Sequence, residues 1–455
     1  MHKNRRLRLV NEHIFKEASV YMTKEARCKN IRNSLFSAIT KVASVPDNCV
    51  RKPGIDFTRN RKLPLSAMLL MLIGMGGGSL MKELHEWFDL SEHTASISAF
   101  VQQRNKIKPE ALECVFHKFL ESVSLSRTYH GYRLMAVDGS DLRMPTNSND
   151  SFSVIQNEDG GKHYNLVHLN AMYDLVNHTY VDAEIQPKKG MNEHAALVSM
   201  VDRSQLPGNV IALMDRGYES FNNIALFQEK GWNYIIRAKD SYGIIRKLEV
   251  PNTPEFDTDI VLTLTRRQTK ETLELLKKYP MRYRWIQPHT TFDYIKPKES
   301  KFYDLKFRAV RFRISEGIYE TVYTNLDTKE FPLERIKELY YHRWGIETSF
   351  RELKYAIGLA SLHGKKKEFM LQEVFARLVL YNYTSLIAHC VEIPEGKRVN
   401  ISAAAYFCRQ FLRMKIAPSL VLEKIVKHLS PIRPDRQFPR YQNLISPIGF
   451  QYRIS

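Results

Sequence analysis

Cysteine is scarce in this chain, and long apolar runs are missing. Five cysteines occur among 455 residues, none in a Cys-x-x-Cys pair, so neither a disulfide framework nor a zinc site is expected. The most apolar run, residues 67–75, is too short to cross a bilayer and leads into three glycines. The basic N-terminus MHKNRRLRLV lacks a following apolar stretch and does not look like a signal peptide. We therefore expect reduced thiols and a cytosolic protein with no membrane partner.

Several catalytic motifs are also missing. The chain contains no G-x-x-x-x-G-K-[ST] sequence, so the phosphate-binding loop of P-loop ATPases is excluded. It contains no G-x-S-x-G sequence, so a serine hydrolase with a nucleophile elbow is not expected. His163, His168 and His194 stand at spacings that match no metal motif, and we expect them to be core or surface side chains.

Acidic residues are few relative to basic ones. Asp and Glu total 49 against 68 Lys and Arg, which gives a formal net charge of +19 and a pI near 9.5. Such a charge favours a polyanionic partner, with nucleic acid first and an anionic membrane second. The hydrophobic content of 44% suits a globular protein, but the chain is too long for one compact core. We therefore expect roughly two to four domains.

The segment YYHRWGIETSFRELK, residues 340–354, is predicted to be helical. Leu, Glu, Lys and Arg dominate it, and Pro332 suits the start of the helix. On a helical wheel one stripe is apolar and therefore faces a core: Leu339, Ile346, Phe350, Leu353 and Ile357. A second stripe carries a phenol, a guanidinium, a carboxylate and an amine: Tyr340, Arg343, Glu347 and Lys354. A carboxylate between two cations suits a metal ligand with phosphate contacts on either side.

Two aspartates each follow directly on a short apolar strand. RLMAV is followed by Asp138, and NVIALM is followed by Asp215. Functional sites gather at the carboxyl ends of strands in open sheets. Further strands are expected at 168–175, 180–185 and 233–238, and helices at 193–201 and 220–228. This order of elements favours a mixed α/β sheet.

Taken alone, each of these residues has a plainer explanation. An aspartate after a strand is usually a turn residue or a helix cap, and regularly spaced charges are common on exposed amphipathic helices. Together they suggest three carboxylates in one site, which repel one another unless a divalent cation binds. Oxygen ligands without a His or Cys cluster suit Mg²⁺ or Mn²⁺, and two ions are usual for phosphodiester chemistry. The residues alone therefore predict a metal-dependent nuclease or phosphoryl-transfer enzyme acting on DNA or RNA.

The spacing of Tyr340, Arg343, Glu347 and Lys354 also resembles a known signature. The pattern Tyr-x2-Arg-x3-Glu-x6-Lys surrounds the last catalytic acidic residue in one branch of the DDE transposases of bacterial insertion sequences. The sequences VDGSDLRMP and ALMDRGYESFN are similar to those around the first and second catalytic aspartates of that family. The resemblance spans most of the chain, roughly residues 60–390, and implies an RNase-H-like core.

The resemblance implies roles for individual residues. The catalytic residues, which would also be the metal ligands, are Asp138, Asp215 and Glu347. The residues that would hold phosphates of the transposon end are Tyr340, Arg343 and Lys354. Arg216, next to one of the ligands, would contact DNA or pair with a carboxylate.

Five segments are expected along the chain. They are a helical DNA-binding domain (1–130), the first part of the RNase-H-like core (131–240), an inserted β-rich subdomain (241–330), the second part of the core (331–392) and a helical tail (393–455). In the first segment, two short helices precede a helix at 96–107 that carries Arg104 among other polar side chains. This arrangement is compatible with a helix-turn-helix-like reader with Arg104 as a DNA contact, and equally with a helical domain that has a solvated polar face. The family resemblance favours DNA.

The predicted function is that of a transposase with Mg²⁺ or Mn²⁺ as cofactor and DNA as partner. It would bind the terminal inverted repeats of an insertion sequence, cut a strand at each end and join the freed 3′-OH to target DNA. Pairing of two ends implies at least a homodimer, and the family implies the bacterial cytoplasm and nucleoid. Two alternatives remain open: an RNase-H-like nuclease that cuts without joining, and an inactive DNA-binding relic or repressor.

Overall fold

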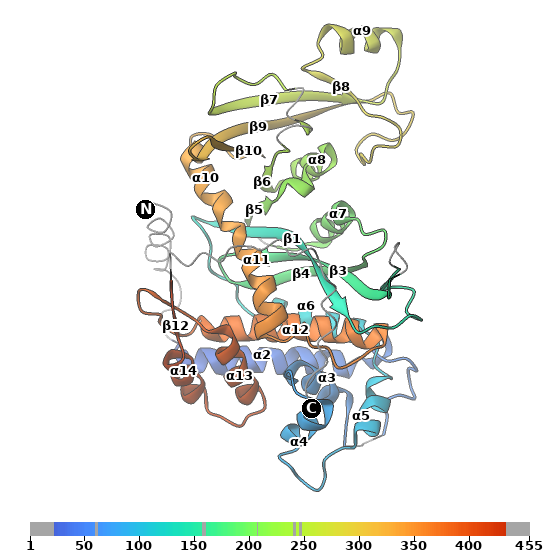
Figure 1. Cartoon of the computed structure of the whole chain (residues 1–455), viewed down its shortest axis with the longest axis vertical. Helices are drawn as coiled ribbons and strands as arrows, with labels where there is room; N and C mark the ends of the chain where they lie inside the picture. The colour runs from blue at the N-terminus through green and yellow to red at the C-terminus, as the bar shows by residue number, and fades with distance from the viewer. Residues whose placement is uncertain are drawn as a thin grey trace.

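A ten-stranded mixed sheet with helices on both faces forms the centre of the molecule (Figure 1). The computed structural model describes residues 22–59, 62–156, 161–206, 208–239, 243–244 and 248–433. Residues 1–21 of the expected DNA-binding domain and 434–455 of the expected tail lie outside the described residues. Within the described ranges, no helix combines the length and the hydropathy needed to span a bilayer. The α/β fold class expected from the sequence is confirmed.

The sheet runs in the order β2-β3-β1-β5-β6-β10-β9-β7-β8, with β4 also paired to β3. Its strands are β1 (Tyr132–Met144), β2 (Val154–Ile155), β3 (Tyr164–Asp174), β4 (Thr179–Pro187), β5 (Asn209–Met214), β6 (Asn233–Arg237), β7 (Phe256–Thr265), β8 (Tyr283–Trp285), β9 (Phe302–Ser315) and β10 (Ile318–Thr324). A separate two-stranded pair joins β11 (Lys397–Arg398) to β12 (Ser430–Pro431).

The strands that come first in the chain form an RNase-H-like core. β1 pairs antiparallel with β3, and β3 pairs antiparallel with β4. On its other side β1 is parallel to β5, which is in turn parallel to β6. Helix α7 (Glu193–Arg203) precedes β5, and α8 (Phe221–Lys230) connects β5 to β6, as a parallel crossover requires.

The inserted β-rich segment continues the same sheet and does not form a sheet of its own. β10 pairs antiparallel with β6, and β9, β7 and β8 follow in order beyond it (Figure 1). A free β6 edge would expose unpaired backbone groups, and pairing with β10 satisfies them. Helix α9 (Lys270–Lys278) lies at the far end of this extension (Figure 1).

Different helices cover the two faces of the sheet. α7 and α8 pack on one face, toward which Met135 and Val137 of β1 point. Helix α10 (Leu333–His342) packs on the other face against Leu134, and α11 (Trp344–Arg351) packs there in the same hydrophobic cluster as Ala136. Because side chains alternate along a strand, even-numbered positions of β1 face α10 and α11 and odd-numbered positions face α7.

A helical body lies below the sheet and unites the two ends of the described chain (Figure 1). Its helices are α2 (Lys24–Ser44), α3 (Leu65–Gly74), α4 (Leu80–Trp87), α5 (Ile97–Arg104), α6 (Glu110–Ser122), α12 (Lys367–Ala388), α13 (Ile401–Leu412) and α14 (Pro418–Lys427). The long helix α12 is buried along most of its length and packs against α2, α3, α6, α13 and the sheet. The expected N-terminal domain and C-terminal tail therefore share one hydrophobic core with α12.

The segment predicted as one helix over 340–354 is divided. α10 ends at His342, α11 begins at Trp344, and a π-helical turn, η4 (Glu352–Ala356), follows. Around Arg343 the backbone makes tighter i→i+3 bonds, from Arg343 N–H to the Tyr340 carbonyl and from Ile346 N–H to the Arg343 carbonyl. The apolar stripe is nevertheless confirmed, because every residue predicted for it is buried.

Candidate active site

The two predicted catalytic aspartates lie at equivalent positions on neighbouring parallel strands. The pairing of β1 with β5 ends at Val137 and Met214, so Asp138 and Asp215 are the next residues on the two strands. β5 stops there, and the Asp215 carboxylate accepts a hydrogen bond from the Gly217 N–H at 2.7 Å. β1 was predicted to end at this point, but it continues to Met144 because β3 pairs with it over that length.

The segment 340–354 meets β1 on the face defined by even-numbered positions. Arg343 Nη1 lies 3.8 Å from Asp138 Oδ2, and Lys354 Nζ donates to Ser140 Oγ at 2.8 Å. Lys354 also donates to the Asp141 carbonyl at 2.8 Å. Both cations of the sequence signature therefore contact the strand that carries the first aspartate.

Arg343 also links this strand to the third predicted carboxylate. Its Nη2 donates to Glu347 Oε1 at 3.1 Å, one helical turn along α11. The Arg343 side chain is 6% exposed and lies against the ring of Tyr340, with its guanidinium carbon 5.7 Å from the ring centre. Tyr340 is itself buried, and this burial raises the pKa of its hydroxyl to about 12. The position of Tyr340 suits support of Arg343 and does not suit a direct phosphate contact.

The electrostatics of the site favour a bound cation. Burial, together with the nearby charges of Asp215 and Glu347, raises the pKa of Asp138 to about 6, against the opposing effects of the Gly139 N–H and Arg343. A carboxylate that is hard to ionise beside two others is the expected result of crowding acids in a partly buried place. The positive charge of Arg343 partly offsets this crowding.

The donor set fits a divalent ion that prefers oxygen ligands. Asp138, Asp215 and Glu347 offer carboxylate oxygens without sulfur or imidazole, as Mg²⁺ and Mn²⁺ prefer. Among the residues that the structure describes, no group of three or more His, Cys, Asp or Glu side chains is already close enough to hold a metal ion. Arg343 instead lies between Asp138 and Glu347.

A second cluster lies behind β1, on the face of its odd-numbered positions. His168 of β3 is the cross-strand partner of Asp141, and its ring bridges Asp141 and Glu193. The sequence did not single out Glu193, and His168 was expected only in a core or on a surface. Because side chains alternate along β1, Asp141 can be placed on this rear face from its position alone. Placing His168 beside it also requires the register between β1 and β3, which the sequence does not give.

The other two predicted DNA contacts, Arg216 and Arg104, differ in exposure. Arg216 is exposed directly after Asp215, where a DNA strand at the carboxylates can reach it. Arg104 is 2% exposed, and its guanidinium binds Glu373, Gln372 and the Phe369 carbonyl of α12. Arg104 thus joins α5 to α12, and the expectation that it contacts DNA does not fit this burial.

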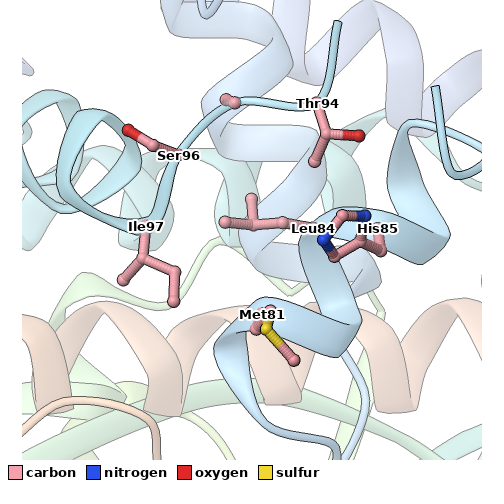
Figure 2. A pocket seen from close by; sticks show the side chains of 7 residues that line it. Met81, Leu84, His85, Thr94, Ser96 and Ile97 are labelled. Carbon is pink, nitrogen blue, oxygen red and sulfur yellow. The ribbon is translucent and has the colours of Figure 1, made fainter. Parts of the chain in front are cut away.

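The expected DNA reader corresponds to the helices α3, α4 and α5. A loop connects α4 to α5. A pocket of about 230 Å³ opens there, and Figure 2 shows side chains of both helices and the loop around it: Met81, Leu84, His85, Thr94, Ala95, Ser96 and Ile97. Ser96 caps α5 by accepting from the Ala99 N–H. Met81 and Ile97 are exposed at the pocket. DNA reading by these helices stays a prediction.

Comparison with known proteins places the chain in a family. The family described as Transposase DDE domain matches residues 129–383, more than half of the chain. The chain belongs to this family. The prediction of a DDE transposase, an enzyme that breaks and joins phosphodiester bonds of DNA, is therefore confirmed.

The chain is also similar to two individual proteins. The transposase InsG for insertion sequence element IS4 of Escherichia coli (strain K12) is 23% identical over 444 residues, which cover 90% of this chain and 92% of that protein. A solved piggyBac transposase synaptic complex with hairpin DNA is similar over 93% of this chain and 88% of that chain, with 9% identity and a TM-score of 0.42.

Proposed function

We propose that this transposase binds the terminal inverted repeats of an insertion sequence, cuts DNA at their ends and joins the freed 3′-OH groups to target DNA. The observation that carries the proposal is the meeting of Asp138 and Asp215 at the end of paired parallel strands, with Arg343 joining Asp138 to Glu347. The similarity to InsG over nearly the whole length of both chains supports the extension to an insertion sequence.

Three carboxylates form the proposed metal site. Asp138, Asp215 and Glu347 would hold two Mg²⁺ or Mn²⁺ ions, and bound ions would supply activation of the attacking water or 3′-OH and stabilisation of the leaving oxygen. Before DNA binds, the negative charges of Asp138 and Glu347 hold the Arg343 guanidinium at the site.

The cationic side chains around the carboxylates are the proposed binding residues for the DNA end. The N–H groups of Arg343 that now face Asp138 and Glu347 could donate to a phosphate as well, or to a phosphate instead. The planar guanidinium suits bidentate phosphate contact. Lys354 lies beside β1 and adds a point charge, and exposed Arg216 extends the basic surface from the second aspartate. Two ends must be held together for joining, so we also propose that a homodimer assembles on DNA.

The decisive experiment uses a duplex that carries the DNA end flanking this reading frame. The protein is incubated with Mg²⁺ or Mn²⁺, and cut and joined products are separated on a denaturing gel. Asp138→Asn, Asp215→Asn and Glu347→Gln should each abolish cutting and joining while binding of the duplex persists. Glu352→Gln is the matched control, because Glu352 follows Glu347 along the same segment but accepts a hydrogen bond from Tyr381.

The outcomes distinguish the transposase from the two alternative functions. Cutting and joining that both disappear in the three variants support the transposase. Cutting without joining would indicate an RNase-H-like nuclease, and binding without cutting by the wild type would indicate an inactive relic. Activity that survives Glu347→Gln would remove α11 from the site.

A further inference from the structure

The rear face of β1 carries a bridge of three side chains directly behind the proposed catalytic aspartate. His168 Nδ1 lies 2.6 Å from Asp141 Oδ1, and His168 Nε2 lies 2.8 Å from Glu193 Oε1. Asp141 belongs to β1, His168 to β3 and Glu193 to the first turn of α7. The imidazole therefore connects the three elements that surround Asp138 from behind.

Both ring nitrogens of His168 face carboxylate oxygens, so both must donate. Only the protonated imidazole has two N–H donors. Burial lowers the pKa of His168, but the hydrogen bonds and charges of Asp141 and Glu193 outweigh this and raise it. Two cations also lie near the bridge: Lys188, 2.9 Å from Asp141 Oδ1, and Lys354 on the Asp141 carbonyl. The titratable ring of His194 lies beside Glu193, and burial lowers its pKa.

The bridge lies against the backbone that follows each of the two proposed catalytic aspartates. A methyl group at Gly139 would lie 2.2 Å from His168 Nε2 and 2.5 Å from Glu193 Oε1, so only glycine leaves room for the bridge. A methyl group at Gly217 would lie 3.8 Å from Glu193 Oε2. The N–H groups of these same two glycines hold the carboxylates of Asp138, at 2.8 Å, and Asp215, at 2.7 Å.

We infer that His168 is a positioning residue: by joining Asp141 to Glu193 it fixes Glu193 behind Gly139 and Gly217, and so holds the two backbone N–H groups that orient Asp138 and Asp215. The inference deepens the proposed function and rests on it. His168 and Glu193 act through the backbone and through one another, whereas Asp138 and Asp215 would act on the DNA chemistry itself. Outer partners of this kind typically change activity by about 10–100-fold.

Four variants test the bridge in single-turnover cleavage of the flanking-end duplex at saturating concentration. His168→Ala should lower the rate by at least about tenfold, with the Kd for the duplex within about twofold of wild type. Glu193→Ala should do the same, and the double variant should be no worse than either single variant, because each removes the same bridge. Glu193→Gln keeps an oxygen that accepts from His168 and should retain most of the rate.

A matched histidine provides the control. His194 follows Glu193 on α7 but accepts from the Asn223 amide at 2.8 Å, outside the bridge, so His194→Gln should leave cleavage unchanged. Thermal melting of each variant distinguishes positioning from unfolding. A Glu193→Gln variant as inactive as Asp138→Asn would make Glu193 a direct participant and overturn the positioning role.

A second measurement does not depend on activity. Nitrogen-15 NMR of histidine-labelled protein should show both ring nitrogens of His168 protonated at pH 7, a signature that Asp141→Asn together with Glu193→Ala should abolish. A neutral His168 ring, or an active wild type whose His168→Ala variant cuts at full rate, overturns the inference. A wild type that never cuts refutes the proposed function, while the ring-nitrogen spectrum still decides whether the bridge exists.

Discussion

Arg343 joins Asp138 to Glu347: its guanidinium lies 3.8 Å from Asp138 Oδ2 and donates to Glu347 Oε1 at 3.1 Å. The joined residues come from a central strand and from a helix more than two hundred positions later in the chain. Arg343 thus serves as the internal counter-ion of a site built from carboxylates. A bound cation and Arg343 relieve the same repulsion, so the two should partly substitute for one another.

The first prediction concerns removal of this counter-ion. Arg343→Ala should lower the melting temperature of the metal-free protein in EDTA, because Asp138 and Glu347 lose their shared cation. Added Mg²⁺ should raise the melting temperature of Arg343→Ala by more than that of wild type, since ligand binding stabilises the folded state. Thermal melts with and without Mg²⁺ measure both effects.

Arg351→Ala is the control for this prediction, because Arg351 is exposed on the same helix. It should melt as wild type in both conditions. An equal response of wild type and Arg343→Ala to Mg²⁺ would mean that Arg343 and the ion do not share a site.

The second prediction concerns pH. The pKa of Asp138 is raised to about 6 by burial and by its acidic neighbours, whereas in the unfolded chain the carboxyl ionises near 3.8. Between these values the folded protein keeps a proton that the unfolded chain has lost, so the free energy of unfolding falls as pH rises from about 4 to about 6. Asp138→Asn removes this dependence and should be more stable than wild type at pH 7 in EDTA, by about 3 kcal/mol.

Urea denaturation from pH 4 to pH 8 in EDTA measures this difference. The advantage of Asp138→Asn should be near zero at pH 4 and should stop growing above pH 7. Glu316→Gln, in the exposed turn between β9 and β10, controls for the loss of one negative charge. A constant difference across the whole range would show that Asp138 is not crowded as described.

Local patterns in the sequence predicted local structure well. The apolar stripe from Leu339 to Ile357 is buried as expected, because its spacing directly reflects which side of a helix faces the core. The strand before Asp215 ends where the sequence predicted, whereas β1 continues past Asp138 because β3 pairs with it there. Periodicity and strand ends are properties of short segments, and a single sequence contains them.

Features that depend on distant partners were not predicted. Arg104 lies among polar residues in the sequence. Nothing near it indicates that Glu373 is buried beside it. The inserted segment shows short strands, but nothing in it indicates that β10 pairs with β6 and extends the central sheet. The bridge at His168 depends in the same way on the register between β1 and β3. Register and tertiary pairing arise from the whole chain and are weakly encoded in any one segment.

The third prediction concerns Arg104, which was expected on the surface. Its guanidinium and the Glu373 carboxylate are each 2% exposed and lie 2.9 Å apart. Although burial opposes it, Arg104 and His363 hold the pKa of Glu373 well below its usual value. Arg104→Met leaves this carboxylate without its main counter-ion and should lower the free energy of unfolding by about 3–5 kcal/mol. Glu373→Gln in the same chain should recover part of the loss.

Urea denaturation measures the stability, and duplex binding is measured under conditions where the variant is folded. Binding should be unchanged, because Arg104 does not reach the surface. Gln102→Ala, on the exposed side of α5, is the stability control. A folded Arg104→Met protein that binds DNA much more weakly would return Arg104 to the DNA interface.

The last prediction concerns Gly139, which separates Asp138 from the bridge at His168. Gly139→Ala places a methyl group 2.2 Å from His168 Nε2 and 2.5 Å from Glu193 Oε1, closer than these atoms can approach. The bridge must then move away from β1, and the N–H that orients Asp138 must move with the strand. We therefore expect cleavage by Gly139→Ala to fall by at least about tenfold, as for loss of the bridge itself.

Gly77→Ala is the control glycine, because a methyl group there meets no atom within 4 Å. It should cut as wild type, which shows that glycine replacement alone does no harm. In a His168→Ala background one of the two close contacts is gone, so Gly139→Ala should lower the cleavage rate by a smaller factor than it does in wild type. Equal factors in the two backgrounds would mean that Gly139 and His168 act separately, and that the glycine is needed for some other contact of β1.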